Sequence, residues 1–211
     1  MKNIKYALIG LAPYSFHYDL SKTFGSENWR LLQYLIAFDD IHNFWLPPEI
    51  YRGLFNQEFL LQRLSLDNFD TNNVYIEKRF ARPLGWAERI IARNGIDVWK
   101  NKNYPETRNE NIKILDNYLT LCEENDIRPL IFLPPFSEGY IKHFSKQKID
   151  EFYYLVREAQ KKHPSAAFVD GWKIQGFSDA DFGDVDHLNF QGAAKFSTIL
   201  NDVIENIESK I

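Results

Sequence analysis

Three short and almost wholly apolar runs constrain the fold of this chain more than any other feature. They are Tyr6 to Leu11 (YALIGL), Pro129 to Pro135 (PLIFLPP) and Ala166 to Gly171 (AAFVDG). Apolar runs of this length, closed by Pro, Gly or Asp, are typical of strands buried on both faces of a parallel sheet. Longer amphipathic patterns separate the runs. The sequence therefore predicts an α/β fold, a parallel sheet with flanking helices joined by right-handed crossovers.

Three segments show apolar residues at helical spacing and are predicted to be these helices. They are residues 109–126, residues 149–162 and residues 192–208. In the first, Cys122 falls on the apolar face with Leu115 and Leu119. Because Cys122 is the only cysteine, we expect a buried thiol and no intrachain disulfide.

Residues 29–100 fit this alternation poorly and are predicted to be an insertion after the first strand, partly helical and partly loop. The whole chain, residues 1–211, is expected to form one domain. The insertion would lie over the carboxyl ends of the strands, where open α/β sheets bind ligands. Inside it, the segment Asp39 to Trp45 groups two Asp, a His and an Asn. Their spacing fits no metal-site or triad template, so no metal and no cofactor are predicted.

Charge and hydropathy exclude several classes of partner. The formal net charge is -4, and acidic and basic residues are interspersed. Nucleic acid is therefore not an expected partner. No apolar run reaches the roughly 20 residues that span a bilayer. The run after Lys5 is too short, and too soon interrupted by Pro13, for a signal peptide, so a cytoplasmic location is expected unless the natural N-terminus lies upstream.

The stretch FGDVDHLNFQG, Phe182 to Gly192, carries the strongest chemical pattern. A histidine that acts as a general base needs an acceptor at its second ring nitrogen, which fixes the tautomer and stabilises the imidazolium. Asp184, three residues before His187, can fold back to provide it, whereas Asp186 is expected to point elsewhere unless the loop is irregular. The alternative is a surface turn whose Asp and Asn residues cap the following helix. Three other histidines lack such neighbours and are expected to be exposed: His17, His143 and His163.

The segment DVDHLNFQGAAKFSTIL resembles the final motif of the SGNH (GDSL-like) hydrolase superfamily: Asp, two residues, His, Leu-Asn, Gly and an amphipathic last helix. LIFLPPF and AFVDG match the two preceding strands in order. The chain is particularly similar to the divergent branch associated with modification of cell-surface polysaccharides and teichoic acids. The resemblance covers YALIGL and roughly residues 109–211. It implies a three-layer, flavodoxin-like sheet in which Asp184 orients His187 as the general base.

The nucleophile is the difficulty in this resemblance. The superfamily carries its serine in a Gly-Asp-Ser or Gly-x-Ser turn after the first strand, and no such turn occurs here before the end of YALIGL. The following APYSFHYDLS resembles the region after the third strand instead. One interpretation is that the first strands are missing, which would leave an apolar sheet edge able to self-associate. The other is that Ser15 is a displaced nucleophile. Tyr14, at the place of an oxyanion-hole side chain, and Asn189 are expected to face the substrate.

Together these features lead to one functional expectation and one alternative. The resemblance implies a serine esterase or acyltransferase, acting on an acylated carbohydrate or cell-envelope polymer without a cofactor. The alternative is a non-catalytic carbohydrate-binding or assembly module that keeps the sheet. Aromatic residues make up 16% of the chain, and their flat faces could stack on sugar rings, although aromatic side chains more often fill cores.

Overall fold

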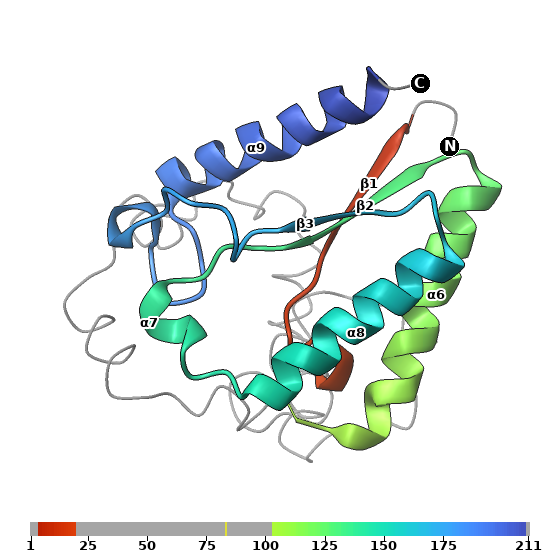
Figure 1. The fold of residues 1–211 in the computed structure, drawn as a ribbon, viewed down its shortest axis with the longest axis horizontal. Coiled ribbons are helices and arrows are strands. Elements are labelled where there is room, and N and C mark those ends of the chain that lie inside the picture. The colour runs from red at the N-terminus through yellow and green to blue at the C-terminus, as the bar shows by residue number, and fades with distance from the viewer. Residues whose placement is uncertain (1–3, 20–82, 84–102, 210–211) are drawn as a thin grey trace, which may run out of the picture.

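A computed structural model describes residues 4–19, 83 and 103–209 of the chain (Figure 1). Nearly all of the predicted insertion, including the segment Asp39 to Trp45, lies outside the described residues. The strands are β1 (Tyr6–Gly10), β2 (Arg128–Leu133) and β3 (Ala167–Asp170). The α-helices are α6 (Arg108–Glu124), α7 (Glu138–Ile141), α8 (Lys146–Lys162) and α9 (Phe190–Glu208). Single 3-10 turns are η1 (Ser15–His17), η6 (Pro105–Thr107) and η7 (Asp179–Asp181).

The three strands form one parallel sheet in the order β1-β2-β3. They coincide with the three predicted apolar runs, so the parallel α/β prediction is confirmed for this part of the chain. β2 lies in the middle and ends at Leu133. Pro134 and Pro135 follow, and because proline has no backbone N–H, neither can continue the hydrogen-bonded ladder.

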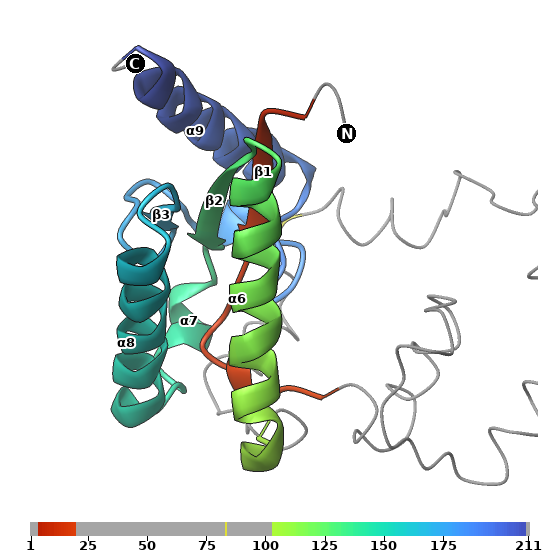
Figure 2. The same ribbon diagram turned by 90° about the vertical axis from the view of Figure 1, so that its right-hand side faces the viewer.

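Helices cover both faces of this sheet, α9 on one and α6 with α8 on the other (Figure 1). Figure 2 shows α6 and α8 side by side. The buried residues of the α6 and α8 face include Leu115, Leu119, Ile131, Leu133, Phe152 and Val156. Those of the α9 face are Leu130, Val169, Phe196 and Leu200. Successive residues of β2 thus point to opposite cores, which explains why its sequence is apolar without alternation.

β1 is less buried than its sequence predicts. Leu8 is aligned with Leu130 of β2, yet it is 53% exposed, because α9 packs over β2 and β3. Burial of β1 on both faces is therefore wrong. Among the residues that the structure describes, no strand pairs with the outer edge of β1. Within the same residues, no helix has the length and apolar character needed to span a membrane.

The chain after β3 returns across the carboxyl ends of the strands, where the candidate site lies. Its first residue, Gly171, donates its N–H to the Leu133 carbonyl at 2.8 Å. A Cβ at Gly171 would lie 2.3 Å from that carbonyl oxygen, so only glycine allows this close approach of the two strand ends.

Candidate functional site

The loop between Phe182 and Leu188 is a compact turn attached to the end of β2. Its two ends form an antiparallel bridge, and Gly183 donates its N–H to the His187 carbonyl at 3.0 Å. In the middle of the loop, the Val185 carbonyl accepts both the N–H and the hydroxyl of Ser137, at 3.1 and 2.8 Å. Ser137 lies just beyond β2. These bonds fix the loop at the carboxyl edge of the sheet.

Asn189 connects this loop to α9 and is 4% exposed. It is the N-cap of the helix: its Oδ1 accepts the N–H of Gly192 at 2.9 Å, while its Nδ2 donates to the Ala180 carbonyl at 2.7 Å. The close fit extends to Gly192, where a Cβ would lie 2.1 Å from the Asp181 carbonyl oxygen. The alternative in which an Asn caps the following helix is therefore correct for Asn189. Its substrate contact stays a prediction.

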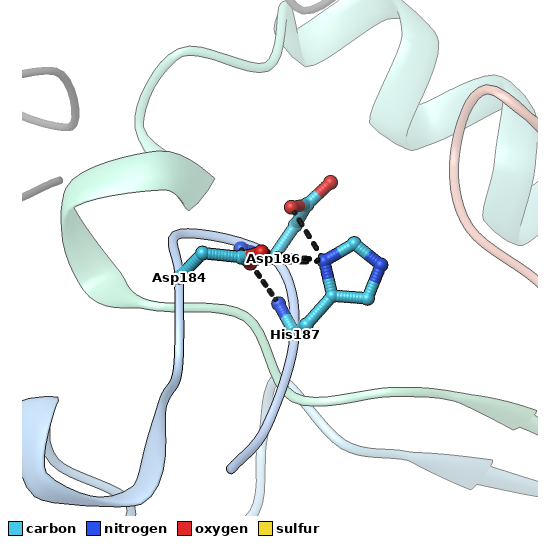
Figure 3. A group of neighbouring side chains, drawn as sticks. All are labelled: Asp184, Asp186 and His187. Carbon is cyan, nitrogen blue, oxygen red and sulfur yellow. Dashed lines mark hydrogen bonds and ion pairs between the residues drawn. The ribbon is translucent and has the colours of Figure 1, made fainter. Parts of the chain in front are cut away.

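His187 and Asp184 are in direct contact (Figure 3). The Nδ1 atom of His187 lies 2.9 Å from Oδ1 and 3.1 Å from Oδ2 of Asp184. The same Oδ1 accepts the backbone N–H groups of His187 at 2.8 Å and of Asp186 at 3.1 Å. An Asp side chain that binds the backbone two and three residues ahead forces a tight turn, and this turn brings the imidazole back over the carboxylate. The contact that the spacing predicts is present.

Asp186 also contacts the imidazole, so the expectation that it points elsewhere in a regular loop does not hold, and the exception made for an irregular loop applies. Its Oδ1 lies 3.1 Å from His187 Nδ1. The loop curves tightly enough to place both acids on the same side of the ring, and the Tyr140 hydroxyl forms a hydrogen bond with Asp186. Hydrogen bonds to Asp184 and Asp186 outweigh burial and raise the pKa of His187 to about 9. The side chain is 57% exposed, and its second nitrogen lies on the side away from both carboxylates (Figure 3).

An aromatic cluster lies beneath this loop and packs against Val185. Its members, from the turn after β1, the segment after β2, α7 and the chain after β3, are Tyr14, Phe136, Tyr140, Phe144 and Trp172. The Tyr14 ring stacks on Phe144 with centroids 6.2 Å apart. Burial first, and the charge of Asp186 second, raise the pKa of Tyr14, so its hydroxyl stays protonated and able to donate. The structure thus brings Tyr14 next to the acids of the site.

Ser15 follows Tyr14 and begins the 3-10 turn η1. Its Oγ accepts the N–H of Ala12 at 2.9 Å. This bond links Ser15 back to the residue three positions before it, and it does not involve His187. The structure therefore places Ser15 beside a site residue, while its role as a nucleophile stays a prediction.

Two other histidines are buried and paired, so their predicted exposure is wrong. His163, 3% exposed at the end of α8, lies between two carboxylates of α6. Its Nδ1 is 2.9 Å from Glu123 Oε2 and its Nε2 is 2.9 Å from Asp116 Oδ1. Burial opposes the charged form, but the two hydrogen bonds outweigh it and raise the pKa of His163. The imidazole thus connects α8 to α6 through both of its nitrogens.

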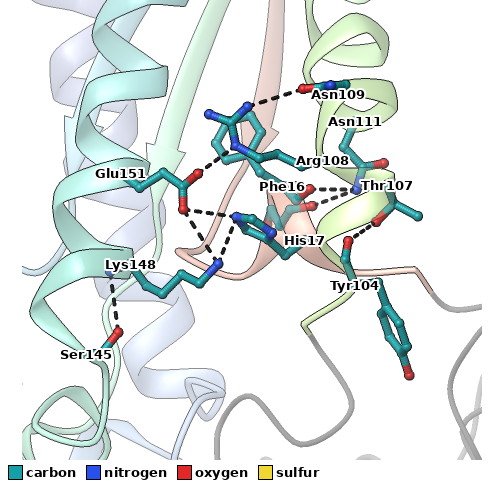
Figure 4. Close-up of polar contacts among 11 residues, drawn as sticks. Phe16, His17, Tyr104, Thr107, Arg108, Asn109, Asn111, Ser145, Lys148 and Glu151 are labelled. Carbon is teal, nitrogen blue, oxygen red and sulfur yellow. Dashed lines mark hydrogen bonds and ion pairs between the residues drawn. The ribbon is translucent and has the colours of Figure 1, made fainter.

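His17 forms the second buried pair, with residues of α8 (Figure 4). Its Nε2 lies 3.0 Å from Glu151 Oε2 and 3.1 Å from Lys148 Nζ. Glu151 Oε1 accepts Arg108 Nε at 2.6 Å. Burial, only partly offset by Glu151, lowers the pKa of His17. The network joins η1, α6 and α8. No local sequence signal could reveal it, because His17 and Glu151 are 134 residues apart.

Asp184, Asp186 and His187 also form a group that could hold a metal ion. Their potential ligand atoms all lie within 4.8 Å of one another. The ligand nitrogen would be Nδ1, the atom that faces both carboxylates at hydrogen-bonding distance. A proton at Nδ1 therefore satisfies the same two charges, and the geometry is explained by hydrogen bonding alone.

Comparisons of the chain with protein-family models, with curated proteins and with solved structures found no match. Functional inference therefore depends on the residues of the site and their geometry.

Proposed function

We propose that this chain is an SGNH-like esterase or acyltransferase domain that acts on an acylated carbohydrate or cell-envelope polymer. The observation that carries the proposal is the 2.9 Å contact between His187 Nδ1 and Asp184, on a loop at the carboxyl edge of a parallel sheet. A histidine held in this way at one nitrogen can exchange a proton at the other. The carboxyl edge is also where open α/β sheets bind ligands.

We also propose that the complete fold is three-layered and flavodoxin-like. The presence of helices on both faces of the described parallel sheet supports this arrangement. In such a fold the loops after successive strands meet at one edge, as the turn with Tyr14, the segment with Ser137 and the loop with His187 do here.

The proposed mechanism is acyl transfer through a serine. His187 Nε2 accepts the proton of the serine hydroxyl as the oxygen attacks the ester carbonyl, and Asp184 stabilises the imidazolium. The ester C–O bond then breaks, and the leaving alcohol takes the proton from His187. Water or a sugar hydroxyl repeats these steps to release the acyl group. In this mechanism the Tyr14 hydroxyl donates a hydrogen bond to the oxyanion. Ser15 is the candidate nucleophile, since its Oγ accepts the N–H of Ala12 and keeps its own hydrogen to donate.

Two measurements test the proposal. The first is hydrolysis of p-nitrophenyl acetate and of an acetylated oligosaccharide by wild type, His187→Ala and Ser15→Ala, with His143→Ala as a matched control. We expect His187→Ala and Ser15→Ala to lose hydrolysis and to keep the far-UV circular dichroism of the wild type. The His187 side chain is 57% exposed, so its removal should disturb little packing. Hydrolysis that survives His187→Ala would contradict the mechanism.

The second measurement is labelling of the folded protein by a fluorophosphonate probe, with the adduct located by mass spectrometry. An adduct on Ser15 is expected. An adduct on a different serine would remove Ser15 while leaving the His187 proposal in place. No adduct and no hydrolysis would favour the non-catalytic binding module instead.

A further inference from the structure

We propose that Asp186 is a second positioning carboxylate for His187, held in place by Tyr140. This inference rests on the proposed function, because it concerns the same imidazole, but its test does not require catalysis. A motif of Asp, two residues and His needs only one carboxylate. Here the residue directly before the histidine supplies another, at 3.1 Å from Nδ1.

Asp184 is shared among several hydrogen-bond donors. Its Oδ1 accepts two backbone N–H groups in addition to His187 Nδ1. A carboxylate oxygen that serves three donors gives less of its charge to each of them. Asp186 adds a second negative charge at almost the same distance from the ring. The imidazolium therefore faces two carboxylates, and the charged form is favoured more strongly than one acid alone would favour it.

Asp186 is fixed by a buried side chain and by its own backbone. Tyr140, which hydrogen-bonds to it, is 3% exposed. The Tyr140 ring packs edge-on against Phe136 and Phe144, with centroids 5.6 and 5.3 Å away. A ring enclosed in this way cannot change rotamer without disturbing the cluster. The residue between the two acids, Val185, is itself bound through its carbonyl to Ser137. Asp186 is thus held by a buried hydroxyl and by a fixed backbone.

Several ionisable groups lie near His187 and its two acids. The loop contributes Asp184 and Asp186, α7 contributes Tyr140, and the turn after β1 contributes Tyr14 with Tyr18 beside it. Burial is the largest cause of the raised pKa of both Tyr14 and Tyr140, so both stay neutral wherever His187 titrates. The two carboxylates therefore determine the charge on the imidazole. The consequence is a general base that becomes available only in alkaline solution, and Asp186 is, after Asp184, the second residue that shifts its pKa upward.

The test is the titration of His187 in the folded protein, followed by NMR of the imidazole Cε1–H. In the wild type the midpoint is expected at about 9. Asp186→Asn keeps the shape of the side chain and removes its charge, and it should lower the midpoint by about one unit or more. Asp202→Asn, which removes an exposed acid of α9, is the matched control and should leave the midpoint unchanged. If the Asp186→Asn variant titrates with the same midpoint as the Asp202→Asn control, the proposal is overturned.

The role of Tyr140 is measured by a double-mutant cycle. If Tyr140 holds Asp186 against the ring, Asp186→Asn should move the midpoint less in a Tyr140→Phe background than in the wild type. Equal shifts in both backgrounds would remove Tyr140 from the proposal. Tyr154→Phe, at a ring that is 52% exposed, is the control.

The same variants separate this inference from the proposed function. If hydrolysis occurs, the acidic limb of the pH profile of kcat/KM should move to lower pH in Asp186→Asn by the shift that NMR measures. An NMR shift without hydrolysis at any pH would leave the role of Asp186 intact and refute the proposed function. Hydrolysis without an NMR shift would do the reverse.

Discussion

Substitution of Asn189 by alanine tests whether this residue stabilises the site or binds the substrate. The side chain is buried and makes two bonds of known geometry: Oδ1 caps α9 through the N–H of Gly192, and Nδ2 donates to the Ala180 carbonyl. Loss of an N-cap costs about 1 kcal/mol, and loss of the second hydrogen bond costs about 1 kcal/mol more. We therefore expect Asn189→Ala to lower the free energy of unfolding by about 2 kcal/mol, or Tm by about 4 to 8 °C.

Asn189→Ser separates the contribution of the N-cap from that of the hydrogen bond to the Ala180 carbonyl. Serine caps a helix about as well as asparagine does, but it has no amide to reach the Ala180 carbonyl. Its cost should therefore be about 1 kcal/mol, half that of the alanine variant. Asn201→Ala is the control: Asn201 is exposed on the same helix and bonds Glu205 at 2.7 Å, so its loss should cost less than about 0.5 kcal/mol.

The assay is urea unfolding at neutral pH, followed by circular dichroism of the helices. The expected order of stability is wild type and Asn201→Ala, then Asn189→Ser, then Asn189→Ala. If Asn189→Ala is as stable as the control, the capping argument is refuted. If it is also impaired in binding an ester substrate while its stability is unchanged, the substrate-facing role expected from the motif is correct instead.

Three further predictions follow from the geometry. Gly192→Ala places a Cβ 2.1 Å from the Asp181 carbonyl oxygen. We expect the free energy of unfolding, measured in urea, to fall by about 1 to 3 kcal/mol. A decrease as small as that of a surface substitution would contradict the close fit. His163→Gln removes an imidazole whose pKa is raised by its hydrogen bonds to Asp116 and Glu123. The loss of stability in thermal unfolding should therefore be largest below about pH 6.5 and should decrease as the pH rises through the pKa of His163 in the folded protein. A loss of stability that grows with pH would contradict this prediction. Leu8→Lys, at an exposed position of the sheet edge, should preserve stability and reduce any concentration-dependent association seen by light scattering; equal association in the two proteins would exclude this edge as the contact.

The elements of the sheet could be predicted because each depends on its own local sequence. The apolar runs of β2 and β3 and the helical spacing of α6 and α8 are visible within windows of a few residues. Burial of β1 could not be predicted in the same way. Leu8 has the same apolar neighbours in sequence as a central-strand residue, but its exposure depends on where α9 crosses the sheet. That position is determined by packing between elements that are far apart in the chain.

In the site, too, local contacts could be predicted from the sequence and contacts between distant elements could not. The contact of His187 with Asp184 is a turn of four residues, so spacing alone was sufficient to predict it. Asp186 is equally close in sequence, yet its hydrogen bond is with Tyr140, a distant residue that belongs to the aromatic cluster beneath the loop. The pairing of His17 with Glu151 spans 134 residues. Contacts that require two or more elements to be in place are therefore the ones that the sequence pattern misses.

Contact with a carboxylate does not by itself distinguish His187, the proposed base, from the other histidines. His17, His163 and His187 each lie within about 3 Å of an acid, and they differ in access to solvent. The side chains of His17 and His163 are 5% and 4% exposed, and charged groups from neighbouring helices contact them. His187 is 57% exposed, and its acids meet only one nitrogen. A base must exchange its proton with a substrate on one side while an acid holds the other. His17 also meets its acid through one nitrogen, but that ring is buried. Of the three, His187 is the one that combines an acid at one nitrogen with an exposed side chain, and this is the physical reason for proposing it as the base.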